Sequence, residues 1–262
     1  MMGRVLIVAG SDSGGGAGIQ ADVKTVTALG GYAMTAVTAL TAQNTQGVSA
    51  VHQVPADFVA EQMRVTLADI GADCIKLGML HRMEIIETVA DVLRECVAGI
   101  PVVVDPVMIS KGGASLLEAA AVEVLKTRIL PLATLTTPNI PEAEVLAGVK
   151  IDSAASVISG ISGGAVLLKG GHAMGDIVTD FLLTANGETK EFSSPRIQTR
   201  HTHGTGCTLA AAIATGIAQG LSLVEAVGRA RAYVVRAIET APQFGKGHGP
   251  LNHGHTVADF KL

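Results

Sequence analysis

RVLIVAGSDSGGGAGIQA, residues 4–21, joins a short apolar run to a glycine-rich turn and the beginning of a helical pattern. Similar apolar runs recur farther along the chain, separated for the most part by helical patterns, near residues 32–40, 73–77, 101–105, 133–137 and 164–168. Near-continuous apolar strands that alternate with helices are typical of a parallel sheet covered on both faces. The sequence therefore predicts an α/β fold.

Further segments favour antiparallel additions to this sheet. The run at 48–54 predicts a hairpin after the second strand, and residues 176–184 can pair with 189–194 around Asn186-Gly187, a dipeptide typical of hairpin turns. Helical patterns at about 206–219 and 222–241 close the chain. Because the sequence has no internal repeat, low-complexity tract or linker, we expect a single domain over residues 1–262.

The composition excludes several classes of partner. The 23 acidic residues outnumber the 19 basic ones and the basic residues form no run, which disfavours nucleic acid as a partner. No apolar stretch is long enough to span a membrane, and the start of the chain becomes polar too soon for a signal peptide, so we expect a cytoplasmic protein. Cys74, Cys96 and Cys207 lie far apart, which argues for a reducing compartment and against disulfides or a thiolate zinc site.

Polar and glycine residues follow the predicted strands at the point where each strand ends. They are Gly10 to Asp12, Gln43 and Asn44, Gly78 and Met79, Asp105 to Val107, Asn139 to Glu142, and Lys169 to His172. In an open parallel sheet, ligands bind in the crevice beyond the carboxyl ends of the strands. The sequence therefore predicts one composite site at this edge, with isolated acids suited to a hard metal ion.

The first glycine cluster, residues 14–18, invites a dinucleotide-binding interpretation because Gly16 to Ala21 matches the looser G-x-G-x-x-A form. That interpretation also requires an acid about 20 residues further on. No acidic residue and no arginine lies between Asp22 and Asp57, which disfavours it. The remaining interpretations are a tight turn without a ligand and a wall that lets the backbone approach a small substrate. The chain has no G-x-x-x-x-G-K-[ST] loop for a nucleoside triphosphate.

The second glycine cluster, Gly204-Thr205-Gly206-Cys207, leads into an alanine-rich helical pattern. Free backbone N–H groups and the positive end of the helix dipole favour an anion here, and a transferring phosphate fits that description. The alternative is a helix capped by the threonine after a tight turn. The acids and the lysine at the other strand ends favour the anion site.

Eight stretches in the same order carry a family resemblance: VAGSDSGGGAGIQADVKT, TALTAQNT, KLGML, VVDPVM, TPNIPEAE, LLKGGH, HGTGCTLAAAIA and GKGHGPLNH. Together they resemble the hydroxymethylpyrimidine/phosphomethylpyrimidine kinases of thiamine biosynthesis, members of the ribokinase-like superfamily, over residues 4 to about 254. The resemblance implies a central, mostly parallel sheet with helices on both faces and a small hairpin extension. It also implies ATP-dependent phosphorylation of 4-amino-5-hydroxymethyl-2-methylpyrimidine and then of its monophosphate, and a homodimer.

The resemblance further implies roles for individual residues. Gln43 binds the pyrimidine in a pocket whose apolar walls are Ala17, Met79 and Val107, with Asp22 close by. Mg²⁺ is held by Asp105 and Glu142, and the nucleotide is contacted by Lys169, Asn139, Thr205 and Arg231. The catalytic turn consists of Gly204, Thr205, Gly206 and Cys207. From the residues alone, Met79 and Val107 could equally be core, Asp105 could cap a turn, and Lys169 could be solvated. Arg231 stands where relatives often carry lysine, and its planar fork differs from a point ammonium.

Cys207 has four possible roles: nucleophile, general base, metal ligand and packing. A nucleophile needs a base and a third group that orients the base. His203 is close in sequence, but no orienting group can be recognised near it. Relatives in the wider superfamily commonly carry an aspartate base in this position. A helix N-terminus lowers the pKa of a thiol, so a thiolate near neutral pH is physically reasonable, and the sequence leaves open whether Cys207 acts as a thiolate base or mainly orients the hydroxyl. The alternatives for function are a pyridoxal kinase of the same branch and, more remotely, a nicotinamide-dinucleotide-binding or non-catalytic domain.

Overall fold

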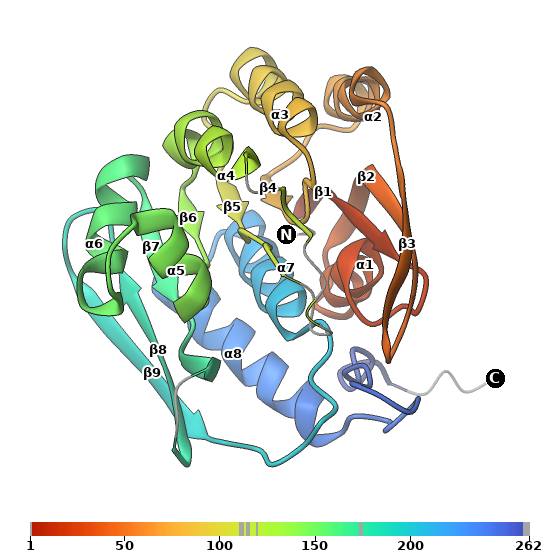
Figure 1. Ribbon diagram of the computed structural model, residues 1–262, viewed down its shortest axis with the longest axis vertical. Coiled ribbons are helices and arrows are strands. Elements are labelled where there is room, and N and C mark those ends of the chain that lie inside the picture. Colours follow the sequence, from red (N-terminus) through yellow and green to blue (C-terminus); the bar gives the residue numbers. More distant parts are fainter. Residues whose placement is uncertain (1, 110–112, 114–115, 119, 173–174, 259–262) are drawn as a thin grey trace.

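The structure is a computed structural model that describes residues 2–109, 113, 116–118, 120–172 and 175–258. Its strands form a nine-stranded sheet in the order β3-β2-β1-β4-β5-β6-β7-β8-β9, with β3 and β9 at opposite edges of the molecule (Figure 1). The strands are β1 (Arg4–Asp12), β2 (Tyr32–Asn44), β3 (Gly47–Gln53), β4 (Cys74–Leu77), β5 (Val102–Val104), β6 (Leu135–Thr136), β7 (Ala165–Leu168), β8 (Ile177–Leu183) and β9 (Thr189–Pro195).

The strands from β2 to β7 are parallel, as the near-continuous apolar runs predict. Val5 to Val8 of β1 are fully buried because helices cover both faces of the sheet. β1 and β2 extend beyond the predicted ends, and after a bulge at Gly10 the register places Asp12 beside Thr41. The extension carries polar residues out over the edge of the sheet, which the apolar pattern alone does not reveal.

Both predicted antiparallel additions are present. β3 pairs with β2 and forms a small, largely exposed extension. β8 runs antiparallel to β7 and forms a hairpin with β9. The pairing of β8 and β9 ends at Leu183 and Thr189, so the connection is longer than the two-residue turn that Asn186-Gly187 often forms. Gly187 has φ 85° there, a backbone conformation that glycine adopts readily.

The helices form two layers. They are α1 (Gly18–Ala28), α2 (Ala56–Asp69), α3 (Met83–Cys96), α4 (Ala121–Val124) with its continuations η1 (Leu125–Ile129) and η2 (Leu130–Leu132), α5 (Ile140–Ala147), α6 (Ile151–Ser162), η3 (Gly170–His172), α7 (Thr205–Ala218) and α8 (Leu223–Glu239). One apolar core joins the sheet to α2 through α6, and the other joins it to α1, α7 and α8.

Helices α7 and α8 lie side by side (Figure 1) because small residues line their contact. A Cβ added at Gly216 would lie 2.8 Å from Ala226 Cβ. The alanines of α7 are buried almost all round, so this helix sits deep in the molecule. Among the described residues, no helix has the length and apolar character needed to cross a membrane.

Candidate active site

A cavity of about 640 Å³ lies beyond the carboxyl ends of the parallel strands. Its lining includes residues from every strand end that the sequence points to, together with the start of α7: Asp12, Ala17, Gln43, Met79, Asp105, Val107, Asn139, Glu142, Lys169, Gly204, Thr205, Gly206, Cys207 and Arg231. The expected gathering of strand ends into one composite site is therefore confirmed. Asp22 is the one candidate residue that is not part of this lining.

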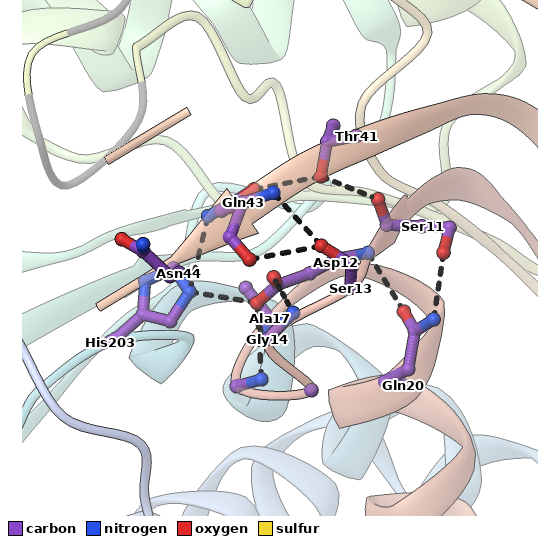
Figure 2. A network of polar contacts seen from close by, with 12 residues as sticks. Ser11, Asp12, Ser13, Gly14, Ala17, Gln20, Thr41, Gln43, Asn44 and His203 are labelled. Carbon is purple, nitrogen blue, oxygen red and sulfur yellow. Dashed lines mark hydrogen bonds and ion pairs between the residues drawn. The ribbon is translucent and has the colours of Figure 1, made fainter. Parts of the chain in front are cut away.

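The first glycine cluster binds a carboxylate of its own chain. Asp12 Oδ1 accepts a hydrogen bond from the Gly14 amide (2.8 Å), and Oδ2 accepts from the amides of Gly16 (3.0 Å) and Ala17 (2.8 Å) (Figure 2). Burial works to raise the pKa of Asp12, but His203 and these amides lower it below its usual value. Because Asp12 occupies the amides that a pyrophosphate would need, the geometry argues against a dinucleotide site here.

Gln43, at the end of β2, is held by its backbone and by its side chain. The Ser13 hydroxyl donates to the Gln43 carbonyl (2.9 Å) and accepts from the Gln43 amide (2.8 Å). The side-chain amide lies between the Thr41 hydroxyl (3.1 Å) and Nε2 of His203 (3.2 Å) (Figure 2). Gln43 is thus fixed at the cavity wall before any ligand arrives.

An apolar wall stands on another side of the cavity. Met79, Leu116 and Ala39 are buried in one cluster, and Val107 packs against it. Gly10 makes room for the methionine, because a Cβ there would lie 2.3 Å from Met79 Cε. Met79 and Val107 therefore belong both to the apolar core and to the cavity wall, so the two interpretations that the sequence left open, core residue and pocket wall, are both correct.

The second glycine cluster begins α7. Gly204, with φ 83°, is the N-cap residue. It lies so close to Gly16 that a Cβ at position 204 would be 1.8 Å from the Gly16 carbonyl oxygen. Thr205 is the first helical residue and donates its hydroxyl to Thr202 O (2.8 Å), so the alternative of a threonine-capped helix is wrong. The first helical hydrogen bond runs from Thr208 N to Gly204 O, and the Thr205 amide donates to Thr202 O (3.4 Å), so the amides of Gly206 and Cys207 have no backbone acceptor among the described residues.

Cys207 lies where the N-termini of α1 and α7 meet, since the Gly18 amide donates toward its sulfur. The thiol is partly buried. Removal from water raises its pKa to about 11; Lys76 works to lower it, whereas Asp22 and Asp105 raise it further. The thiolate that a helix N-terminus favours is therefore not the resting form near neutral pH, because lost hydration and two carboxylates outweigh the helix N-terminus.

This raised pKa has a direct chemical consequence. Only a thiolate is alkylated rapidly by iodoacetamide, so near neutral pH we expect Cys207 to react more slowly than the exposed Cys96. Below its pKa of about 11 the rate at Cys207 should rise about tenfold per pH unit. Mass spectrometry of the labelled peptides measures both rates, with the buried Cys74 as an unreactive reference. Preferential labelling of Cys207 at neutral pH would contradict the raised pKa.

Asp105, Glu142 and Lys169 form a charged cluster beside the start of α7. Lys169 Nζ lies 2.8 Å from Asp105 Oδ1 and 3.9 Å from Glu142 Oε2. A Cβ at Gly206 would lie 3.3 Å from Lys169 Nζ and 3.5 Å from Asp105 Oδ2, so the absence of a side chain lets the helix begin against this cluster. The cluster and the amides of α7 therefore face the same part of the cavity.

The two carboxylates are suited to a hard divalent cation. Burial raises the pKa of Glu142, Lys169 lowers it and Asp105 raises it, which means that one ammonium does not fully balance two carboxylates. Mg²⁺ prefers oxygen ligands and usually keeps several waters, so two carboxylates suffice. Among the described residues no group of three or more histidine, cysteine or acidic side chains is placed to hold a metal.

Asn139 lines the cavity and also caps the N-terminus of α5. Its Oδ1 accepts from the Glu142 amide (2.9 Å), while Glu142 Oε2 accepts from the Asn139 amide (2.8 Å), which together form a capping box at the start of α5. Only the Nδ2 group of Asn139 is left for a ligand. The capping box also fixes the Glu142 carboxylate beside Asp105.

Asp22 lies behind the cavity, not in its wall. Its carboxylate and the Lys76 ammonium form a fully buried ion pair of 2.7 Å, and Asp22 Oδ1 has no hydrogen-bond partner among the described residues. Burial works to lower the pKa of Lys76, but Asp22, Cys207 and Asp105 raise it above its usual value, so Lys76 stays charged. Asp22 is thus close to the cavity without lining it, since its partner Lys76 belongs to the lining, and its role in substrate binding stays a prediction.

Arg231 lines the cavity at its far end and is held by β8 and β9. Its Nε lies 3.2 Å from Asp180 Oδ2, and its Nη2 donates to Val178 O (3.2 Å) and Ser194 Oγ (3.2 Å). The third nitrogen, Nη1, is buried and has no hydrogen-bond partner among the described residues. Because Nη1 is shielded from water, an acceptor in the cavity can reach it only if neighbouring side chains move.

The sequence assigns no role to three residues that the structure brings to this site. Asp12 and His203, 191 positions apart, meet at 2.8 Å, a contact that no sequence spacing reveals. Lys76 did carry a signal, because a lysine inside the apolar strand CIKL implies a buried partner. The sequence could not identify that partner as Asp22.

Comparisons with known proteins agree with this geometry. A family profile described as phosphomethylpyrimidine kinase matches residues 12–252. The thiamine biosynthesis bifunctional protein ThiED of Geobacter sulfurreducens is 52% identical over 257 residues, which are 96% of this chain and 52% of that protein, so the chain spans about half of that relative.

Two further proteins are similar over nearly their whole length. The hydroxymethylpyrimidine/phosphomethylpyrimidine kinase of Streptomyces coelicolor is 47% identical over 261 residues, covering 97% of this chain and 96% of that protein. The structure of the pyridoxal kinase from Staphylococcus aureus in complex with AMP-PCP and pyridoxal superposes with a TM-score of 0.87 at 35% identity, covering 97% of this chain and 94% of that one. The chain has a ribokinase-like fold and belongs to the phosphomethylpyrimidine kinase family.

Proposed function

We propose that the protein transfers the γ-phosphoryl group of ATP to the hydroxymethyl group of 4-amino-5-hydroxymethyl-2-methylpyrimidine, and then phosphorylates the monophosphate to the diphosphate, in thiamine biosynthesis. The observation that carries this proposal is a single cavity with Gln43 and the apolar wall on one side and the charged cluster and the start of α7 on the other. A ring alcohol and a nucleotide can therefore meet in it. The similarity to a pyridoxal kinase bound to AMP-PCP and pyridoxal supports this arrangement.

The pyrimidine lies between the apolar wall and the amide of Gln43. A carboxamide offers a donor and an acceptor side by side, which matches a ring nitrogen next to an exocyclic amine. Ala17, Met79 and Val107 supply apolar surface for the ring faces. The chain is only 3% aromatic, so ring recognition rests on aliphatic and methionine contacts.

The reaction is an in-line displacement. The hydroxymethyl oxygen bonds to the γ-phosphorus as the bond from that phosphorus to the β–γ bridging oxygen breaks, which yields the phosphate ester and ADP. The amides of Gly206 and Cys207 and the Lys169 ammonium stabilise the charge on the transferring group. Cys207 faces the acceptor hydroxyl and takes its proton late, when the residue is a thiolate, because the alcohol is a far weaker acid than a thiol. Arg231 and Asn139 contact the nucleotide.

Asp105 and Glu142 hold Mg²⁺, through water where the ion keeps its own ligands. When bound, the ion neutralises charge on the β- and γ-phosphates and orients them. The donor set fits this ion because both carboxylates are buried beside each other with a single ammonium between them.

Replacing Asp105 with asparagine removes one carboxylate from this pair. We expect the Mg²⁺ concentration for half-maximal activity to rise about 10- to 100-fold. Initial rates measured over a Mg²⁺ titration at saturating ATP test this expectation. Asp57→Asn, at an exposed position on α2, is the matched control and should leave the titration unchanged. An unshifted midpoint in Asp105→Asn would remove Asp105 from the metal site.

One steady-state comparison tests the whole proposal. ATP consumption is measured side by side with the hydroxymethylpyrimidine, its monophosphate and pyridoxal. Turnover of both pyrimidines in preference to pyridoxal is the expected result. Preference for pyridoxal would favour a pyridoxal kinase, and no turnover of any ring alcohol would contradict the kinase proposal.

The organisation of the protein is part of the same proposal. Residues 1–262 act as one kinase domain in the cytoplasm and associate as a homodimer, which the family resemblance supports. Sedimentation equilibrium of the purified protein tests the dimer, and a single monomeric species would contradict it.

A further inference from the structure

We propose that Asp12 and His203 are positioning residues that fix the orientation of the Gln43 side-chain amide, and that this orientation selects a ring with an acceptor nitrogen next to an amine. The inference rests on the proposed function for the identity of the ring. The contact itself is independent of any ligand. Figure 2 shows the residues concerned, which come from the β1 turn, the end of β2 and the segment before α7.

His203 touches both partners through one ring nitrogen. Its Nε2 lies 2.8 Å from Asp12 Oδ2 and 3.2 Å from Nε2 of the Gln43 amide. Asp12 is a charged carboxylate, because its lowered pKa keeps it ionised, and so it only accepts hydrogen bonds. The hydrogen of His203 Nε2 must therefore point toward Asp12 and Gln43.

A protonated ring nitrogen cannot accept a bond from the nitrogen of an amide. A similar conflict arises at the other end of Gln43, where the Thr41 hydroxyl has one hydrogen but lies near two acceptors. These are Ser11 O at 2.9 Å and Gln43 Oε1 at 3.1 Å. Ser11 O only accepts, so the single Thr41 hydrogen goes to it, and Thr41 Oγ1 can then only accept from Gln43.

Both contacts become hydrogen bonds when the Gln43 amide is turned end for end, with the single Nε2–H of His203 shared between Asp12 Oδ2 and the amide oxygen as a bifurcated bond. Its oxygen then accepts from His203, and its nitrogen donates to Thr41. The nitrogen and oxygen of an amide are distinguished by their partners in this way. The assignment leaves one N–H and one oxygen lone pair of Gln43 for a ligand, with their positions determined by His203.

The pair that determines this orientation is itself fixed. Asp12 is 2% exposed and His203 is 8% exposed, and three backbone amides of the glycine turn hold the Asp12 carboxylate. Gly16 allows the ring to approach, since a Cβ there would lie 2.6 Å from His203 Cδ2. A side chain that is ordered before binding loses less entropy on binding, so the effect of this pair falls on affinity for the ring.

The orientation also explains a preference between ring alcohols. A ring that presents two acceptors or two donors to Gln43 leaves one pairing unmade in a partly buried site, which is penalised strongly. A nitrogen acceptor next to an exocyclic amine satisfies both free groups. Selection of the ring therefore depends on one chain of hydrogen bonds, here called the relay, which runs from the glycine turn through Asp12 and His203 to Gln43.

A double-mutant cycle tests the relay. For His203→Leu we expect the KM for the hydroxymethylpyrimidine to rise about 10- to 100-fold, with a much smaller change in kcat. His203→Gln keeps an N–H near the position of the ring nitrogen and should restore most of the affinity. In a Gln43→Met background, His203→Leu should add little, because its target is already absent. His52→Leu, exposed on β3, is the control and should change neither constant.

The outcomes separate this inference from the proposed function. Independent, multiplicative effects in the cycle, or a loss of kcat at unchanged KM, would overturn the relay. Should His203→Leu not fold, Thr41→Val removes the opposite partner of the amide and is expected to raise KM in the same way. The side-chain ¹⁵N–¹H resonances of Gln43, recorded without substrate, should change in His203→Leu or Thr41→Val, and unchanged resonances would overturn the orientation. No turnover by the unmodified protein would contradict the proposed function, while these resonances would still decide the contact.

Discussion

Replacing Cys207 with alanine is expected to lower kcat by about 10²- to 10⁴-fold, the range of general-base contributions. The expectation follows from the position of the sulfur at the meeting point of α1 and α7, beside the amides that face the transferring group. The affinity for ATP should change little, because the amides, Lys169 and the carboxylates stay in place. Single-turnover rates and nucleotide binding by calorimetry measure the two effects separately.

Cys96→Ala is the matched control, since this cysteine is exposed and distant in sequence, and its kcat should equal that of the unmodified protein. An unchanged rate in Cys207→Ala would remove the base role and leave the amides as the main catalysts. A phosphorylated Cys207 trapped on quenching would instead indicate a nucleophile. Cys207→Asp, which supplies the base common in the wider superfamily, should retain more activity than the alanine variant.

The pH dependence of kcat distinguishes a base from a residue that only orients the hydroxyl. Burial raises the pKa of Cys207 to about 11, so the thiolate fraction rises about tenfold for each pH unit from neutral toward that value. If the thiolate accepts the proton, kcat rises with pH in the unmodified protein and stays flat in Cys207→Ala. A flat profile in both proteins would assign Cys207 to orientation alone.

Replacing Lys76 with methionine is expected to lower the free energy of unfolding by about 3–5 kcal/mol, the cost of leaving a buried charge without its partner. Asp22 is fully buried, and Lys76 is its only ionic partner among the described residues. Methionine has a similar length and fills the space, so the loss is electrostatic. Chemical denaturation followed by circular dichroism measures it.

Two comparisons isolate the ion pair. Arg64→Met breaks the exposed pair with Glu95 and should cost no more than about 1 kcal/mol. Lys76→Met combined with Asp22→Leu removes both charges and should recover most of the stability. A double variant as unstable as the single one would show that Lys76 acts through packing.

The instability of Lys76→Met should also depend on pH. Burial raises the pKa of Asp22 to about 6 even with Lys76 beside it, and removal of Lys76 raises it further. The native state of the variant then binds a proton more readily than the unfolded chain. Its deficit is therefore largest above pH 6 and shrinks as the pH falls and Asp22 becomes neutral.

The parallel sheet and its two antiparallel additions were predictable from local sequence, because near-continuous apolar runs alternate with helical patterns and Asn186-Gly187 marks a hairpin, whereas the strand order depends on the tertiary structure. The ends of β1 and β2 were not predictable, since their last residues are polar and take their places through strand register and, for Asp12, through hydrogen bonds to tertiary partners. The gathering of Gln43, Asp105, Glu142, Lys169 and Cys207 at one cavity was predictable, because parallel strands present their carboxyl ends at the same edge.

The charge states within the site were not predictable in this way. A helix N-terminus works to lower the pKa of Cys207, but lost hydration and the surrounding carboxylates raise it. Asp22 follows a glycine turn as a ligand-binding residue would, but it forms a fully buried ion pair with Lys76 of β4, and the lysine lines the cavity while Asp22 does not. Both outcomes depend on neighbours from distant parts of the chain.

By itself, the sequence determined the layers of the fold, the edge of the sheet at which a ligand binds, and the family, because these depend on patterns of apolar and glycine residues within short segments. Only the tertiary structure decided that the first glycine turn holds Asp12 and that Asp12 holds His203 against Gln43. Hydrogen bonds act over about 3 Å between residues that can be far apart along the chain, so their partners are known only once the chain has folded.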